Sequence, residues 1–387
     1  MNLAYTYRQC RSAFTSLFDR RNLLAWGVLL GSLGLVLLSW YNLSNNQQTA
    51  ASAQFELLAD ELSKTLEERM TDHERILLAG AGLFDASQNV TREDWKAFIQ
   101  RLQLSNRYPG IQGVGFTQII PANQRSQFEE QVRAQGFADF SIRPPGLREP
   151  LSAIIYLEPF TGRNLAAFGF DMLSESTRRQ AMLTAAQSGE TRLSGKVTLM
   201  QETHGKVQPG LLMYVPVYRT GQPLSNPTER MQALRGFVYS PYRVHDLING
   251  IFANHSLAID FELYATPAGD PQQLLFSSLG EQPTQLAALS QRELNLHGQT
   301  WLLKFYAPAG FAASLLHSQL PLLSLGGLIS LLLFFLVNSL SRRREQAQNL
   351  ANRMTEQLRR QEQDLRLSEE RLALAVKGSN DGWWDYD

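Results

Sequence analysis

The sequence predicts an α+β fold between two membrane-spanning helices, and three observations carry this prediction. Two windows without a charged side chain, Asn22–Phe55 and Phe305–Ser341, are long enough to contain transmembrane helices. Between them, short segments rich in β-branched and aromatic residues alternate with helical patterns, which is typical of domains with antiparallel sheets. After the second window, apolar residues recur at spacings of four and three, which predicts a coiled coil.

Composition excludes two classes of protein. The chain of 387 residues carries 36 Lys and Arg against 36 Asp and Glu, and zero net charge argues against a nucleic-acid partner, which needs a basic face. Cys10 is the one cysteine of the sequence, so an intramolecular disulfide is impossible. A disulfide-rich secreted domain is therefore excluded.

The two apolar spans are Leu23–Trp40 and Pro321–Leu340. Arginines flank their outer ends, and the bias of basic residues to the cytoplasmic side puts both chain ends inside. The flanking arginines are Arg8, Arg11, Arg20 and Arg21 before the first span, and Arg342, Arg343 and Arg344 after the second. A cleaved signal peptide is the alternative for the first span, because Ala51-Ser52-Ala53 has the A-x-A pattern, although it lies far from the apolar stretch.

Small residues in both spans favour helix pairing. Gly27 and Gly31 form a GxxxG pattern, and Gly326 with Ser330 forms a small-xxx-small pair. We expect a homodimer through these positions; the alternative is that glycine is simply common in membrane helices.

The segment after the second span has a heptad seam with two polar positions. Gln361 and Ser368 occupy positions that a stable coil fills with apolar residues, so the coil is expected to be marginal. A solvated single helix is the alternative. The seam consists of Ala347, Ala351, Met354, Leu358, Gln361, Leu365, Ser368 and Leu372.

The region between the spans has a mixed pattern. An amphipathic helix is predicted over Ala50–Leu78, and further helices over Arg125–Gln135 and Glu175–Ala186. The predicted strands are Ile111–Ile120, Ala153–Leu157, Asn164–Phe170, Gly210–Tyr218, Arg235–Ser240, Ile259–Ala265 and Thr300–Tyr306.

Five sequence blocks carry a resemblance to a known family. In chain order they are RYPGIQGVGF, YLEPFTGRN, FGFDMLSESTRR, AAQSGETRLSG and GLLMYVPVY. Over roughly residues 75 to 240 the chain resembles the CHASE domain, the extracellular sensory module of bacterial and plant receptor kinases and cyclases. The resemblance implies a long N-terminal helix followed by two PAS-like antiparallel-sheet subdomains, with the ligand pocket in the membrane-distal one. It also implies scaffold roles for Glu158, Pro159, Asn164 and Asp171.

The resemblance also points to ligand-binding residues. Plant cytokinin receptors bind an adenine ring through an acidic residue and a threonine, and aligning the blocks puts Arg178 and Tyr214 at these two positions. Ser194 and Met200 fall at other positions that line or support the pocket. Because arginine only donates hydrogen bonds and matches carboxylate or phosphate, an anionic small-molecule ligand is expected instead of an adenine derivative. The alternative is that Arg178 is a solvated helix residue beside Arg179.

The sequence predicts no catalytic residues, no metal site and no cofactor. None of the six histidines stands at the spacing of a zinc site, and no phosphate-binding loop or nucleophile elbow occurs. Whether the protein is an enzyme stays open, because the resemblance implies an output module, a histidine kinase or a diguanylate cyclase or phosphodiesterase, that this chain does not contain.

The prediction is therefore a multi-pass sensor of the bacterial inner membrane that binds a small ligand in the periplasm. The last residues, RLALAVKGSNDGWWDYD, resemble the opening of a PAS domain. A truncated membrane-anchored protein that binds another envelope protein is the alternative function. The predicted parts are a cytoplasmic N-terminus (1–21), transmembrane helix 1 (22–43), the periplasmic CHASE sensor domain (44–307), transmembrane helix 2 (318–340), the coiled-coil signalling helix (341–374) and the truncated start of the PAS domain (375–387).

Overall fold

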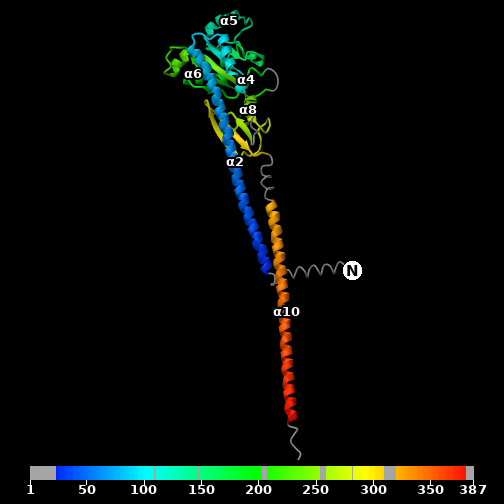
Figure 1. Cartoon of the computed structure of the whole chain (residues 1–387). Helices are drawn as coiled ribbons and strands as arrows, with labels where there is room; N and C mark the ends of the chain where they lie inside the picture. The colour runs from blue at the N-terminus through cyan, green and yellow to red at the C-terminus, as the bar shows by residue number, and fades with distance from the viewer. Residues whose placement is uncertain are drawn as a thin grey trace, which may run out of the picture. The chain divides into compact units, whose positions relative to one another are not determined.

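The computed structural model describes residues 23–108, 110–146, 148–202, 207–252, 259–280, 282–308 and 320–380. The chain forms two compact units, residues 51–311 and residues 1–50 with 312–387, and each is described by itself. Figure 1 traces the elements along the chain. The predicted cytoplasmic N-terminus and the PAS residues Trp383, Trp384 and Tyr386 lie outside the described residues.

Two long helices contain the predicted spans. They are α2 (Leu23–Ala86) and α10 (Leu320–Asn380). By length and composition, both are apolar enough to cross a membrane. The long amphipathic helix predicted after the first span is confirmed, and it forms the second half of α2. The helix continues from the span to residue 86 because no proline interrupts it. The heptad segment is helical within α10, and its apolar seam residues Met354, Leu358, Leu365 and Leu372 are exposed in this single chain.

The two spans pack against each other within the chain through one small residue. A Cβ built on Gly326 of α10 would lie 2.8 Å from the methyl carbons of Val36 of α2, so only glycine allows this approach. Ser330, one turn later, is buried, and the rings of Trp26 and Phe334 lie 5.2 Å apart. By contrast, a Cβ on Gly27 or Gly31 would meet no described atom within 4 Å.

The unit of residues 51–311 contains two antiparallel sheets. The five-stranded sheet has the order β2-β1-β5-β4-β3, and the four-stranded sheet has the order β7-β6-β9-β8. The strands are β1 (Val114–Ile120), β2 (Leu151–Glu158), β3 (Arg192–Leu193), β4 (Gly210–Tyr218), β5 (Leu234–Arg243), β6 (Asp260–Tyr264), β7 (Leu274–Ser277), β8 (Ser290–Leu296) and β9 (Gln299–Tyr306).

Shorter helices connect these strands. The α-helices are α3 (Arg92–Leu102), α4 (Leu104–Arg107), α5 (Arg125–Ala134), α6 (Ser176–Ser188), α7 (Pro227–Ala233) and α8 (Val244–Phe252), and the 3₁₀ helices are η2 (Ala122–Gln124), η3 (Gly162–Ala167), η4 (Met172–Ser174) and η5 (Pro271–Gln273). The predictions missed α3, although Thr91 and Asp94 cap its start reciprocally and could have revealed it.

One predicted strand is wrong. The segment Asn164–Phe170 forms the helix η3 and a following turn. Two local bonds, from the amide of Asn164 to the carbonyl of Thr161 and from Phe168 to Leu165, close its turns. The side-chain amide of Asn164 donates to the carbonyls of Gln112 and Pro159. These bonds hold the first part of the segment in helical turns, and only Gly169 and Phe170, at its end, bond to Ile154 of β2.

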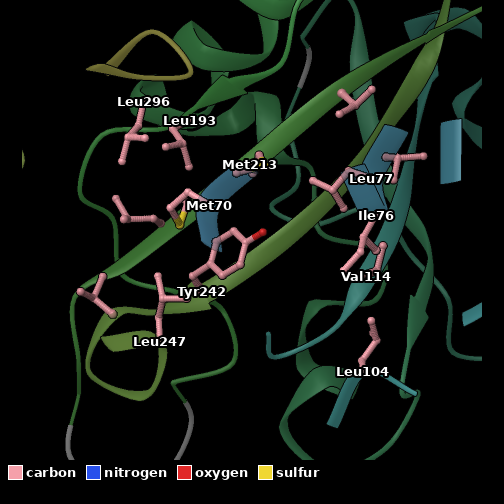
Figure 2. Packing of buried hydrophobic residues seen from close by; sticks show 14 of the residues in the cluster. Met70, Ile76, Leu77, Leu104, Val114, Leu193, Met213, Tyr242, Leu247 and Leu296 are labelled. Carbon is pink, nitrogen blue, oxygen red and sulfur yellow. The ribbon is translucent and has the colours of Figure 1, made fainter. Parts of the chain in front are cut away.

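The apolar stripe of α2 covers one face of the five-stranded sheet. Leu66, Met70, Leu77 and Phe84 recur at spacings of four and seven and are almost fully buried, because these spacings keep side chains on one face of a helix. Figure 2 shows side chains of α2 directed at the strands that carry Val114, Met213 and Tyr242. Each fully buried leucine contributes about 2 kcal/mol of transfer free energy.

The opposite face of the same sheet packs against α6. Alternate residues of β4 enter two different core clusters, because successive side chains of a strand point to opposite faces. Leu211 and Met213 belong to the cluster with α2, whereas Leu212 and Tyr214 belong to the cluster with α6. The predicted ligand-binding residues Arg178 and Tyr214 therefore lie on the α6 side.

Candidate ligand-binding site

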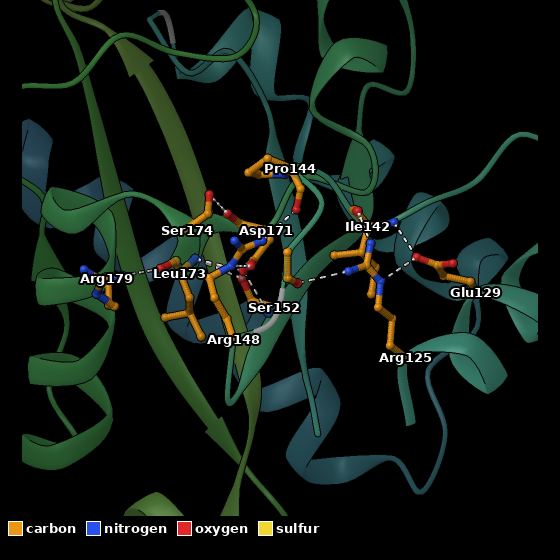
Figure 3. Close-up of polar contacts among 11 residues, drawn as sticks. Arg125, Glu129, Ile142, Pro144, Arg148, Ser152, Asp171, Leu173, Ser174 and Arg179 are labelled. Carbon is orange, nitrogen blue, oxygen red and sulfur yellow. Dashed lines mark hydrogen bonds and ion pairs between the residues drawn. The ribbon is translucent and has the colours of Figure 1, made fainter. Parts of the chain in front are cut away.

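A buried carboxylate fixes the entry to α6. Asp171 is fully buried and accepts hydrogen bonds from the amide and hydroxyl of Ser152 on β2 and from the amide of Leu173 (Figure 3). Arg148 Nε donates to its second oxygen over 2.8 Å. A buried charge needs this many partners, so Asp171 ties η4, immediately before α6, to the sheet.

The carboxylate of Glu175 caps the N-terminus of α6. Glu175 accepts hydrogen bonds from the amides of Thr177 and Arg178, each at 2.9 Å. These are two of the amides that the first turn of a helix leaves without partners. Burial raises the pKa of Glu175, but the hydrogen bonds to these amides and the charge of Arg178 outweigh it, so the pKa is lowered on balance. The carboxylate thus stays charged beside Arg178.

Arg178 points into the interior between α6 and the sheet. The side chain is 6% exposed, which contradicts the alternative of a solvated helix residue. Its Nη2 donates to the carbonyl of Thr198 over 2.7 Å, and its Nη1 donates to Glu175 over 3.3 Å. The guanidinium also stands 5.5 Å from the ring centre of Phe170. Arginine has five N–H donors, so it retains donors for a further acceptor.

Two buried tyrosines lie on the face of the sheet that packs against α6. Tyr214 on β4 is directly opposite Tyr239 on β5, and their ring centres lie 6.4 Å apart. Tyr214 donates its hydroxyl to the sulfur of Met172, whereas the hydroxyl of Tyr239 has no partner among the described residues. Burial raises the pKa of both hydroxyls, and the positive charge of Arg178 opposes this rise. Both tyrosines are therefore neutral donors close to a guanidinium.

The other two predicted residues are placed differently. Ser194 is fully buried, but its hydroxyl donates to the carbonyl of Gly195 and accepts from the amide of Leu212. It therefore joins the end of β3 to β4. Met200 follows in a turn and is 37% exposed. The structure thus groups Arg178 with Tyr214, while Ser194 supports the backbone that leads to Thr198.

The positions expected to be scaffold have internal partners. Glu158 accepts from the amide of Phe160, and Asn164 and Asp171 bond to neighbouring backbone as described above. Sequence reasoning missed Phe170, Met172 and Tyr239, which complete the surroundings of Arg178. The first two stand in the same FGFDM block as Asp171, but only the paired register of β4 and β5 brings Tyr239 opposite Tyr214.

One cation dominates the chemistry of this arrangement. A buried guanidinium is bonded to one carboxylate that is about one third exposed and to one carbonyl, with two neutral tyrosine hydroxyls nearby. Guanidinium binds carboxylate and phosphate through paired hydrogen bonds, and low polarity around it strengthens them.

Comparison with protein families identifies the domain that contains these residues. Residues 88–276 match the family model of the CHASE domain. This part of the chain is a CHASE domain. The match confirms the resemblance carried by the five sequence blocks, and it extends beyond residue 240 to include β6 and most of β7. The chain therefore contains a sensory ligand-binding domain. Two helices that are long and apolar enough to cross a membrane flank this domain in the sequence.

Comparison with solved structures adds two distant similarities. The chain is similar to an extracellular ligand-binding receptor from Desulfohalobium retbaense DSM5692, with 12% identity and a TM-score of 0.40, over 66% of this chain and 40% of that one. It is also similar to the ligand-binding domain of the Pseudomonas aeruginosa PAO1 amino acid chemoreceptor PctB in complex with L-Arg. There the identity is 10% and the TM-score 0.35, over 69% of this chain and 92% of that one. Comparison of the chain with curated proteins finds no match.

Proposed function

We propose that the protein is a membrane receptor whose CHASE domain binds a small anionic ligand beside Arg178. The observation that carries this proposal is the buried guanidinium, which lies between α6 and the sheet with Tyr214 and Tyr239. In this proposal the ligand anion replaces or joins Glu175 on Arg178 and accepts from a tyrosine hydroxyl. Ser194 and Met200 support the pocket from the adjoining segment.

The proposed arrangement follows the predicted parts of the chain. The two sheets are the two PAS-like subdomains of a periplasmic sensor over residues 44–307, held by transmembrane helices at 22–43 and 318–340 in the bacterial inner membrane. Residues 341–374 form a coiled coil in a homodimer, and residues 375–387 begin a PAS domain. The signal passes to a cytoplasmic output module of the histidine kinase or cyclic-di-GMP type.

A set of hydrogen bonds supports transmission from the pocket to the four-stranded sheet. Arg178 donates a hydrogen bond to the carbonyl of Thr198. The strand β3, which precedes Thr198 in the chain, is bonded to the turn between β8 and β9. There the amide of Leu193 donates to the carbonyl of His297, and Gln299 donates to the carbonyl of Leu193. The imidazole of His297 lies 3.4 Å from Glu74 of α2. A ligand that moves Thr198 therefore acts on a segment bonded to the second sheet and, through it, to α2.

The test is a thermal-shift titration of the full chain in lipid nanodiscs with a panel of small carboxylates, phosphates and cytokinins. We expect stabilisation by one or more anions, and its loss in Arg178→Gln. Arg179→Gln is the matched control, because it removes the same charge from the neighbouring, exposed position of α6. Stabilisation by cytokinins and not by anions would contradict the anionic ligand. No stabilisation by any small molecule would favour the alternative, an anchored protein that binds another envelope protein.

A further inference from the structure

A cavity lies beside the segments that follow β3 and precede β4, and its lining includes Thr198, whose carbonyl accepts from Arg178. Its larger lobe, about 430 Å³, is lined by Lys196, Val197, Thr198, Val207, Gln208, Pro209 and Gln273. A second lobe of about 230 Å³ shares Lys196, Val207 and Pro209 with the first. The two lobes are therefore adjacent and meet at one lysine.

Lys196 is a cation without an anionic partner. Its Nζ donates to the carbonyls of Gln272 and Leu274, at 2.8 and 2.9 Å. Among the described residues it makes no ion pair with a carboxylate, and no aspartate or glutamate lines either lobe. An ammonium group has three N–H donors, so one donor is left over. Burial lowers the pKa of Lys196, and no acidic neighbour counteracts this shift.

The rest of the lining combines apolar and polar side chains. Val197, Val207 and Pro209 contribute apolar surface around the lysine. The second lobe adds Pro271, Leu274 and Phe276 among its lining residues. Apolar surface beside a single charged group suits small molecules with one charged end.

Gln208 provides a second unsatisfied group in the larger lobe. Its Nε2 donates to Asp246 over 3.2 Å, which orients the amide. Its Oε1 is buried and has no hydrogen-bond partner among the described residues. A buried acceptor without a partner costs free energy, and because this oxygen is closed off from the lobe, Gln208 forms part of the wall instead of bonding to an occupant.

We propose that this cavity is a second ligand site, which binds a small organic carboxylate with its anionic group on Lys196 and its apolar part along Val207 and Phe276. The site does not depend on ligand binding at Arg178. Because Lys196 belongs to the segment that follows β3 and bonds to η5 and β7, an occupant here would contact both this segment and β7 of the four-stranded sheet. A ligand in this position therefore strengthens or weakens the connection between the sheets.

The test uses hexanoate and 1-hexanol as probes on the full chain in nanodiscs, with binding measured by calorimetry. We expect hexanoate to bind at least tenfold more tightly than hexanol, since only the carboxylate can pair with Lys196. Lys196→Met keeps the aliphatic stem and should reduce hexanoate affinity at least tenfold. Lys64→Met, which removes an exposed lysine of α2, is the matched control and should leave the affinity unchanged.

Two further variants separate this site from its alternatives. Val207→Trp keeps the charge but fills the space shared by the lobes, so it should also abolish hexanoate binding, even if Lys196→Met folds poorly. Arg178→Gln should leave hexanoate binding intact, which distinguishes the cavity from the proposed site beside α6. The proposal is overturned if hexanoate fails to bind, binds no better than hexanol, or binds equally well to Val207→Trp.

Discussion

The imidazole of His73 in α2 stacks on the ring of Tyr242 in β5, with the ring centres 5.5 Å apart and the planes 4° from parallel. Both side chains are buried, and His73 Nδ1 and the Tyr242 hydroxyl have no hydrogen-bond partner among the described residues. The contact lies where α2 covers the five-stranded sheet. A charge on His73 would therefore be placed in the core without a partner.

We predict that this contact makes the domain sensitive to acid. Burial lowers the pKa of His73 to about 4 from an ordinary 6.5, although the charge of Asp72 opposes the shift. Between these values the unfolded chain binds more protons than the folded one, so stability falls as the pH decreases from about 6.5 to 4. The loss attributable to His73 reaches about 3 kcal/mol.

The measurement is urea unfolding of wild type and His73→Phe between pH 4 and 8. The difference in unfolding free energy between the two should be constant above pH 7 and should shift in favour of the variant as the pH falls. Equal pH profiles would mean that His73 does not remain neutral in the fold.

Asp171 should be critical for the start of α6. Asp171→Asn replaces one acceptor oxygen by a donor, which disrupts the bonds to Ser152 or Arg148 and leaves polar groups buried. We expect a loss of about 2–4 kcal/mol in unfolding free energy. Asp139→Asn, at an exposed position, should change it by less than about 0.5 kcal/mol. Equal effects of the two changes would contradict the role given to Asp171.

Packing of the two spans should depend on Gly326 and not on its neighbour. Gly326→Leu forces a side chain against Val36, which costs about 1–3 kcal/mol by overpacking. Gly327→Leu has open space and is the matched control. With Cys10 replaced by serine, disulfide formation between cysteines at Trp26 and Phe334 reports the contact. Its yield should fall in the first variant only.

The exposed seam of α10 should pair with a second copy of the chain. In the same cysteine-free background, Leu358→Cys should form a disulfide between chains, because the seam residues of parallel helices face each other. Arg359→Cys, one position away, should form little. Replacing both Gln361 and Ser368 by leucine should raise the yield at position 358 by stabilising the coil, and equal yields at positions 358 and 359 would contradict the coiled coil.

Much of the fold was predictable from the sequence, because several helices and strands have a strong local pattern of apolar residues. The absence of charge marked both apolar helices. The predicted bounds of β4 match the structure, and those of β5 differ from it by one residue at the start and three at the end. The segment Asn164–Phe170 was mispredicted because local hydrogen bonds, and not its apolar alternation, decide its conformation. Short strands such as β3 and β7 were not predicted, since their extended conformation depends on pairing with β4 and β6, respectively.

For the candidate site, the sequence by itself determined the family blocks, the helix that carries Arg178 and the strand that carries Tyr214. These follow from residue patterns within single segments. Only the tertiary structure decided that Arg178 faces inward, that Tyr239 lies opposite Tyr214, and that Lys196 bonds to β7. The physical reason is that burial and pairing depend on strands and helices far apart in sequence, which meet only when α6 packs on the sheet.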